Sequence, residues 1–185
     1  MSDEYTENQY LTFLLHEEYY ALTVSRVREV LELSELTKIP GMPPYMKGVL
    51  NVRGTVLPVV DLRLKFGIEE AERTIDTAII VAEVTGRDEN TVIVGCLVDS
   101  VDQVIRIEES EIEPAPGLGT TVDVNFIAGM GKQDERFIII LDIDRVFATE
   151  ELHSVEASAS APAAAQAKQG AEAKAAAESE EELST

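Results

Sequence analysis

Residues 46–66 read MKGVLNVRGTVLPVVDLRLKF. The first part is a short apolar run framed by two glycines, which predicts a strand that ends in a turn. The aliphatic, β-branched run Val56–Val60 predicts a second strand. Asp61 follows at once and is placed to act as the N-cap of a brief helix over Leu62–Phe66. The stretch therefore predicts a strand, a glycine turn, a strand and one helical turn.

The same pattern recurs 81 residues later in the chain. A glycine, an aspartate and a phenylalanine repeat at the same spacings of 13 and 5 residues: Gly129, Asp142 and Phe147 against Gly48, Asp61 and Phe66. The apolar run Phe137–Leu141 predicts the matching strand, and Ile143–Phe147 the matching helix. Upstream, Val27 and Val30 match Val101 and Val104 at an offset of 74 residues. We interpret the two halves as copies of one unit, with chance similarity as the alternative.

The rest of the body also favours strands. Four further runs are rich in β-branched and aromatic residues and are bounded by turn residues: Gln9–Leu15, Tyr20–Val24, Thr77–Val84 and Thr91–Val98. An acidic turn at residues 16–18 separates the first two, and residues 85–90 separate the last two. A short turn carrying Ser25 or Asp99 as a cap follows each of these hairpins. Long helical periodicity is missing, so we expect small β-barrels or a sandwich.

Composition excludes several classes of protein. The 185 residues carry 15 Lys and Arg against 35 Asp and Glu, a formal net charge of −20. This charge repels nucleic-acid phosphates and anionic lipid surfaces. The single cysteine, Cys96, rules out an intrachain disulfide and a Cys-based zinc site. The first residues are polar, and no apolar run reaches the roughly 18 residues of a membrane span. We expect a soluble, cytoplasmic protein.

The composition changes near His153. Residues 154–185 include 12 alanines, and their only larger aliphatic residues are Val155 and Leu183. Such a segment buries too little apolar surface to offset its ordering entropy, which predicts a disordered tail with transient helix at most.

No catalytic constellation emerges from the sequence. Cys96 lies inside a strand-like run and is expected to be a small buried apolar residue. His16 lies in a turn beside two glutamates, and His153 lies at the edge of the tail. Asp61 and Asp142 could form an acid–base pair, but capping explains both more simply. The glycine pairs near residues 117 and 129 are not followed by the long helix of a phosphate site, and no metal cluster is visible. We predict no catalysis.

One segment of this acidic chain is basic. From Leu36 to Ile68 there are five cations and one acid, Asp61, which gives a local charge of +4; the cations are Lys38, Lys47, Arg53, Arg63 and Lys65. Arg53 lies beside Gly54 in a predicted turn, where a guanidinium can project from a barrel end and recognise a carboxylate. A docking patch for an acidic partner and internal pairing with the protein's own carboxylates are both open.

Residues 46–66 resemble the signature of the CheW family, the coupling proteins of bacterial chemotaxis arrays. The resemblance spans roughly residues 8–150, and further family-like motifs follow in order: TKIP at 37–40, VDSV at 98–101, IEPAP at 112–116, FIAGMG at 126–131 and ILD at 140–142. It implies an all-β fold of two SH3-like, five-stranded β-barrels around a shared core, with short helical turns. The domain would cover residues 8–153 as two intertwined barrels, and residues 154–185 would be the disordered tail.

The resemblance also implies a function. CheW-family proteins are non-enzymatic adaptors without cofactors or bound metal, and they couple chemoreceptors to the histidine kinase CheA. The implied partners are the cytoplasmic tip of a methyl-accepting chemotaxis protein and the regulatory domain of the kinase, with no nucleic acid and no direct membrane contact. The protein would be a monomer alone and part of rings in arrays, in the cytoplasm beneath the inner membrane.

Carried over motif by motif, the implied receptor-binding groove runs between the two barrels. Its lining would be Val27, Glu29, Gly48, Arg53, Val101 and Val104, with Gly129 nearby. Plain core packing is the alternative for the valines. A kinase contact is implied for the loop 117–119, with Leu118 as its apolar residue. Leu118 stands where family members often carry a bulkier residue, and Glu113 where a basic residue is common, so we expect a weaker contact there.

Three other functions compete with this interpretation. A coupler of another chemosensory-type pathway, for pilus motility or second-messenger control, would carry the same fold and motifs. A small-molecule-binding or catalytic barrel would need a polar pocket with perturbed titratable groups, and the sequence offers no cluster to build one. Nucleic-acid binding by SH3-like barrels is opposed by the net charge.

Overall fold

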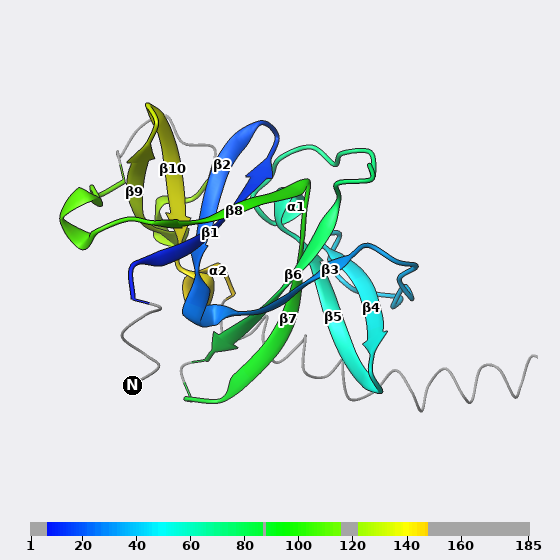
Figure 1. Ribbon diagram of the computed structural model, residues 1–185. Helices are drawn as coiled ribbons and strands as arrows, with labels where there is room; N and C mark the ends of the chain where they lie inside the picture. The colour runs from blue at the N-terminus through cyan, green and yellow to red at the C-terminus, as the bar shows by residue number, and fades with distance from the viewer. Residues whose placement is uncertain (1–6, 87, 116–121, 148–185) are drawn as a thin grey trace, which may run out of the picture.

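The computed structural model describes residues 7–86, 88–115 and 122–147, and these residues form two five-stranded β-sheets (Figure 1). The first half of the chain supplies β1 (Gln9–Leu15), β2 (Glu18–Thr23), β3 (Val27–Glu32), β4 (Met46–Val52) and β5 (Thr55–Asp61). The second half supplies β6 (Ala78–Thr85), β7 (Thr91–Val98), β8 (Ser100–Arg106), β9 (Ile127–Gln133) and β10 (Arg136–Leu141). The described helices are short: α1 (Leu62–Lys65), α2 (Ile143–Val146) and the 3-10 turns η1 (Val24–Arg26), η2 (Glu109–Glu111) and η3 (Val124–Phe126).

The sheet topology confirms the predicted repeat. The strand orders are β8-β1-β2-β10-β9 and β3-β6-β7-β5-β4. Adding five to each strand number, and counting on from β1 after β10, converts the first order into the second. Each sheet therefore takes its hairpin from one half and its other three strands from the other half. Each described copy has five strands, one more than the unit predicted from the sequence.

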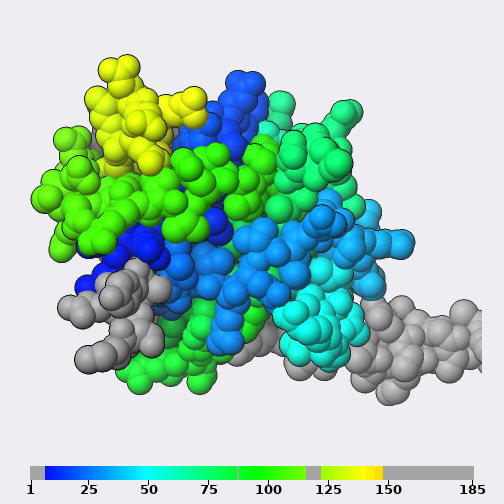
Figure 2. Space-filling view, viewed as in Figure 1, coloured from blue at the N-terminus to red at the C-terminus, as the bar shows by residue number. Residues whose placement is uncertain are grey.

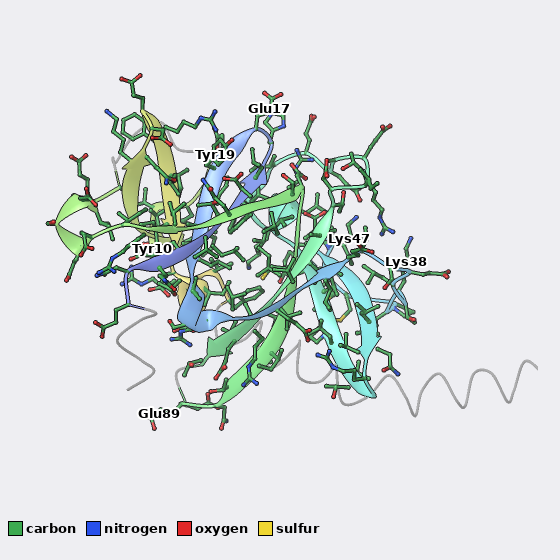
Figure 3. All side chains as sticks on the ribbon, in the orientation of Figure 1. Tyr10, Glu17, Tyr19, Lys38, Lys47 and Glu89 are labelled. Carbon is green, nitrogen blue, oxygen red and sulfur yellow. The ribbon has the colours of Figure 1, made fainter. Side chains whose placement is uncertain are left out.

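The two hairpins point away from each other. Figure 3 labels Glu17 at the tip of the β1–β2 hairpin and Glu89 at the tip of the β6–β7 hairpin, and the two tips lie at opposite ends of the molecule. The β1–β2 turn is His16–Glu17, with positive φ at both residues. β2 begins at Glu18, two residues before the predicted start at Tyr20, and ends at Thr23, one residue before the predicted end. Positive φ at both central residues is the geometry of the type I′ turns that suit two-residue hairpins.

Alternating side chains divide the interior into a shared core and two barrel cores. The shared core takes large side chains from both halves, including Phe13, Tyr20, Leu62, Val94 and Phe147. One barrel core lies around Ile105, Ile138 and Ile140, and the other around Leu57, Val59 and Ile79. Along β10, successive residues thus point alternately into a barrel and into the shared core. A segment buried on both faces is expected to be continuously apolar, as Ile138–Leu141 is.

A ladder of aromatic rings crosses the shared core. Phe13 stacks on Tyr20 with ring centroids 6.0 Å apart, Tyr20 on Phe66 at 6.2 Å, and Phe66 tilts against Phe126 at 5.9 Å. These rings come from β1, β2 and the ends of α1 and η3. Because each such pair adds about 0.5–1.5 kcal/mol beyond its buried area, the ladder helps to hold the two halves together.

The predicted helix caps are confirmed. Asp61 accepts a hydrogen bond from the Arg63 amide at 2.9 Å, and Asp142 accepts from the Asp144 amide at 3.1 Å. Each helix ends one residue earlier than predicted. The predicted capping roles of Ser25 and Asp99, in the turns that follow the two hairpins, are wrong: Ser25 lies inside η1, and Asp99 accepts the amide of His16 in the β1–β2 turn at 2.8 Å.

Two predicted features lie outside the described residues: the tail 154–185 and the loop that carries Leu118. Among the residues that the structure describes, no helix has the length and apolar character needed to cross a membrane.

Candidate functional site

The two equivalent strands β3 and β8 form an edge of each sheet. Within the described residues, β3 pairs with β6 and β8 with β1, so each has one unpaired side. Both strands cross the face turned toward the viewer in Figure 1, and Figure 2 shows their side chains next to each other on that face. Val30 and Val104, which match at the 74-residue offset, are 44 % and 55 % exposed. Both edge strands therefore expose a valine at equivalent positions.

Val27 and Val101 each lie three residues before one of these exposed valines and are less exposed. Both are half-buried and pack against the shared core. The sequence leaves two roles open for these valines, docking and core packing. The structure gives each valine a buried part that packs and an exposed part that a partner can reach.

Arg53 and Glu29 meet across the strands. Arg53 lies in the two-residue β4–β5 turn with φ +49°, and Gly54 follows with φ +82°. The Gly54 amide donates to Asn51 Oδ1 at 3.0 Å, which fixes the turn. The Arg53 guanidinium projects outward with 75 % of its side chain exposed and forms an ion pair with Glu29 on β3. The predicted polar residues of the groove therefore contact each other.

This ion pair borders a pocket of about 560 Å³. The pocket lies between β3 and the β4–β5 hairpin, and its lining residues are Arg28, Glu29, Val52, Arg53, Thr55, Leu57, Val81 and Ile93. Two arginines and one glutamate give it a net positive charge. A carboxylate or a helix C-terminus is the kind of group that such a lining binds.

A second pocket of about 170 Å³ occupies the equivalent place on the other barrel. It is lined by Tyr19, Asp102, Gln103, Gln133, Asp134, Arg136 and Ile138. Arg136 donates to the Tyr19 hydroxyl at 2.6 Å, and its guanidinium lies 5.0 Å from the centre of that ring. This pocket was not predicted from the sequence, although the 81-residue offset that matches Gly48 to Gly129 also matches Arg53 to Asp134.

The two glycines of the predicted groove are buried and pack against crossing segments. A Cβ on Gly48, whose φ is +142°, would overlap the carbonyl oxygen of Thr37, and one on Gly129 would overlap the side chain of Ile112. Because these glycines lack a Cβ, the segments that contain Thr37 and Glu113 can approach closely. These segments cover the outer edges of β4 and β9, where Thr37 pairs with Val49 and Glu113 with Met130. Their place in a groove stays a prediction; the structure gives each of them a packing role.

Most of the basic segment pairs internally. Lys47 forms an ion pair with Glu70, and its hydrogen bond and charge lower the pKa of that carboxyl. The buried Arg63 lies 3.2 Å from Asp99, and the Lys65 ammonium lies 4.6 Å from the centre of the Tyr45 ring. Figure 3 labels Lys47 beside the barrel and Lys38, which is exposed, further out. Of the predicted patch, Arg53 and Lys38 remain at the surface.

Titratable side chains away from these pockets have structural roles. Cys96 is fully buried, as predicted, and desolvation raises the pKa of its thiol to about 12. Burial raises the pKa of Asp61, against the hydrogen bonds that it accepts as an N-cap. Among the described residues, no group of three or more His, Cys, Asp or Glu is arranged to hold a metal ion. The site can bind a partner through apolar contact and paired charges.

Two five-stranded barrels that exchange hairpins, with charged pockets beside edge strands that expose valines, define a double-barrel domain. The chain belongs to the CheW-like domain family, whose sequence model matches residues 9–151.

Curated relatives agree with this assignment. The chain is 37 % identical to the chemotaxis protein CheW of Bacillus subtilis over 80 % of this chain and 92 % of the relative. It is 31 % identical to that of Klebsiella aerogenes over 84 % of this chain and 91 % of the relative. The crystal structure of the scaffolding protein TtCheW from Thermoanaerobacter tengcongensis is similar, with a TM-score of 0.69 and 37 % identity over 78 % of this chain and 90 % of that one.

Proposed function

We propose that this protein is a non-catalytic chemotaxis adaptor that couples chemoreceptors to a CheA-type histidine kinase. Membership of the CheW-like family supports the pathway. The Glu29–Arg53 pair, set beside two edge strands with exposed valines at matching positions, supports a docking role for this face. The folded domain is the unit 8–153, which acts in receptor arrays beneath the inner membrane.

The receptor tip lies along the face between β3 and β8. A helix that presents an apolar stripe contacts Val27 and Val30 on one barrel and Val101 and Val104 on the other. Arg53 and Glu29 form the polar rim and fix the register of the helix. Gly48 and Gly129 act indirectly, because they hold the segments that cover β4 and β9.

The kinase regulatory domain docks on a different surface, to which the loop around Leu118 contributes. Two separate surfaces on one rigid domain make the adaptor bivalent, so modest affinities combine through avidity in an array. The protein is a monomer alone and joins rings in arrays. The state of the receptor then biases the geometry of the assembly and hence the kinase.

The test is binding of the full chain to the isolated receptor tip and, separately, to the kinase regulatory domain. The wild type, Arg53→Glu and Arg73→Glu are compared by calorimetry. Arg73 is an exposed arginine in the connection between α1 and β6, so it controls for the change in charge. We expect the wild type and Arg73→Glu to bind both partners, and Arg53→Glu to lose the receptor tip alone.

Two results would overturn the proposal. A folded wild-type chain that binds neither partner removes the coupling function. Equal binding of the tip by Arg53→Glu and Arg73→Glu removes Arg53 from the docking face.

A further inference from the structure

A pocket of about 630 Å³ lies at one end of the barrel that contains β1, β2 and β10. Its walls include the beginning of β1, the ends of β2 and β10, and residues of the short helices η1, η2 and α2. It shares no lining residue with the two pockets beside the edge strands, and no valine of the proposed docking face lines it. The pocket is therefore a separate cavity that the proposed function leaves unused.

A tyrosine hydroxyl in this pocket has no protein partner. Tyr10, near the start of β1 (Figure 3), is 7 % exposed, and its hydroxyl makes no hydrogen bond to another residue that the structure describes. A buried tyrosine normally finds such a partner. The hydroxyl is not sealed inside the core, because Arg63 Nε is the only fully buried unpaired side-chain nitrogen or oxygen among the described residues. The Tyr10 hydroxyl therefore opens on the pocket.

The other barrel shows that the fold does not require this hydroxyl. Tyr10 pairs with Thr23 across β1 and β2, and Ile79 pairs with Leu97 across β6 and β7. These pairs are equivalent, since the 74-residue offset that matches Val27 to Val101 also matches Thr23 to Leu97. Both members of the second pair are buried and apolar. One barrel thus places two hydroxyls where its repeat has only hydrocarbon, and Thr23 makes no capping bond with its own.

The charge of the pocket is negative. Its lining holds three carboxylates and one arginine, and Arg26 lies 2.6 Å from Asp144. Asp142 lies 3.2 Å from Arg145, which is outside the lining. The third carboxylate, Glu109 on η2, is exposed, and its side chain forms no ion pair or hydrogen bond with another described residue. One negative charge at the rim therefore remains uncompensated.

The free carboxylate and the free hydroxyl lie close enough to interact. Burial is the main cause that raises the pKa of Tyr10, and the negative charge of Glu109 raises this pKa further. The phenol therefore stays neutral at physiological pH, and its oxygen can accept a hydrogen bond. The same charge that disfavours a phenolate favours a bound cation.

We infer that this pocket binds a small guanidine compound, a guanidinium group on a short aliphatic stem. A guanidinium presents several donors in one plane, so it can donate to the Glu109 carboxylate and to the Tyr10 hydroxyl together. The aliphatic stem packs on Ile112 and Ile143, which also line the pocket. The volume lies within the range of small-molecule sites, which favours a free ligand over a partner's side chain. The inference does not rest on the proposed function.

The test is an NMR titration of the full chain with butylguanidine and with butylurea, its neutral isostere. The ring signals of Tyr10 are identified by their absence from the spectrum of Tyr10→Phe. We expect butylguanidine to shift these signals to saturation and butylurea to bind at least about tenfold more weakly, because it lacks the charge.

Two substitutions test the two recognition groups. Glu109→Gln should weaken binding of butylguanidine about tenfold, while Glu72→Gln, which removes an exposed carboxylate between α1 and β6, should leave it unchanged. Tyr10→Phe should weaken binding about fivefold, followed on the amide signals of Thr23 and Ile112. Its urea midpoint should stay at the wild-type value, because the hydroxyl has no protein partner to lose. A hydroxyl with a structural role would instead lower this midpoint.

Three results would overturn the inference. Tyr10 signals that do not shift to saturation with butylguanidine exclude the site. Equal binding of butylurea, or equal effects of Glu109→Gln and Glu72→Gln, exclude recognition of a cation. Displacement of butylguanidine by the receptor tip or by the kinase regulatory domain overturns a free ligand and assigns the pocket to that partner.

Discussion

Arg53 and Asp134 occupy the same position in two equivalent hairpin turns and carry opposite charges. Both have φ +49°, and each is followed by a second residue with positive φ, Gly54 at +82° and Glu135 at +65°. Each turn borders the pocket of its own barrel. The two copies therefore share a backbone and differ in the charge that they present, so a repeated fold offers two chemically distinct surfaces.

The contribution of the Arg53–Glu29 pair to folding stability and its contribution to binding can be measured separately. Both side chains are partly exposed, so the free energy of unfolding of Arg53→Glu should change by no more than about 0.5 kcal/mol. Its affinity for the receptor tip should fall about tenfold or more, as for an arginine hot spot. Urea denaturation and calorimetry measure the two quantities.

The charge swap Arg53→Glu with Glu29→Arg provides the control. It restores an ion pair between the strands but presents it to the partner in reverse. We expect it to leave the tip affinity low. Recovery of wild-type affinity would mean that the pair acts only by fixing the turn.

Substitution by alanine should reduce folding stability more at Gly48 than at Gly129. A Cβ on Gly48 meets backbone atoms of Thr37 that cannot move aside, and its φ of +142° is itself unfavourable for alanine. At Gly129 the nearest atom is the Cγ2 methyl of Ile112, which rotation of that side chain can move, and the nearest backbone atom is the Glu113 carbonyl oxygen at 3.1 Å. We expect Gly48→Ala to cost about 3 kcal/mol or more and Gly129→Ala about 1–2 kcal/mol.

Gly54 is the matched control, because it has positive φ with open space around it. Gly54→Ala should therefore show the conformational cost alone, about 1 kcal/mol. Equilibrium urea denaturation ranks the three variants. A loss of stability at Gly48 no larger than at Gly54 would contradict the close approach of Thr37.

The sequence predicts best what depends on neighbours in the chain. The strand over Thr91–Val98 was predicted with its observed ends, because a strand buried on both faces is continuously apolar between polar turns. The caps at Asp61 and Asp142 also follow from local order. The edge strands β3 and β8 are harder to predict, since polar residues alternate with valines and one bulge interrupts each.

What depends on distant parts of the chain could not be predicted from spacing. The repeat shows that the halves are equivalent, but not that each hairpin completes the other half's sheet. The family resemblance implied intertwined barrels without saying which strands are exchanged. Arg63 lies 3.2 Å from Asp99 and 3.3 Å from His16, and no local pattern in the sequence connects these three residues. The pocket beside Tyr19 was missed for the same reason.

Asp61 gives a prediction about pH. Burial is the main cause that raises the pKa of this carboxyl in the folded protein. The stability that the group contributes is therefore present below its unfolded pKa and lost as the pH rises through the folded value. Asp61→Asn keeps an oxygen to cap α1 and removes the charge. Relative to the wild type, it should be more favourable at pH 7 than at about pH 3.5.

Asp61→Ala separates the cap from the charge. It loses the acceptor for the Arg63 amide, so it should be about 1 kcal/mol less stable than Asp61→Asn at both pH values, because neither variant carries the charge. Urea denaturation of the three proteins at each pH measures the differences. An Asn variant whose deficit grows as the pH rises would show that the carboxylate stabilises the fold.

Cys96 provides a probe of opening of the shared core. Its side chain is fully buried, and a thiol whose pKa is raised to about 12 carries almost no thiolate at pH 8. Because the thiolate is the reactive form, a disulfide reagent should label the native chain only as fast as the core unfolds. Labelling in about 6 M urea should be immediate and gives the full amplitude. If the rate in native buffer rises with reagent concentration and is unaffected by the destabilising variant Gly48→Ala, the thiol is reached through local motion rather than through opening of the core.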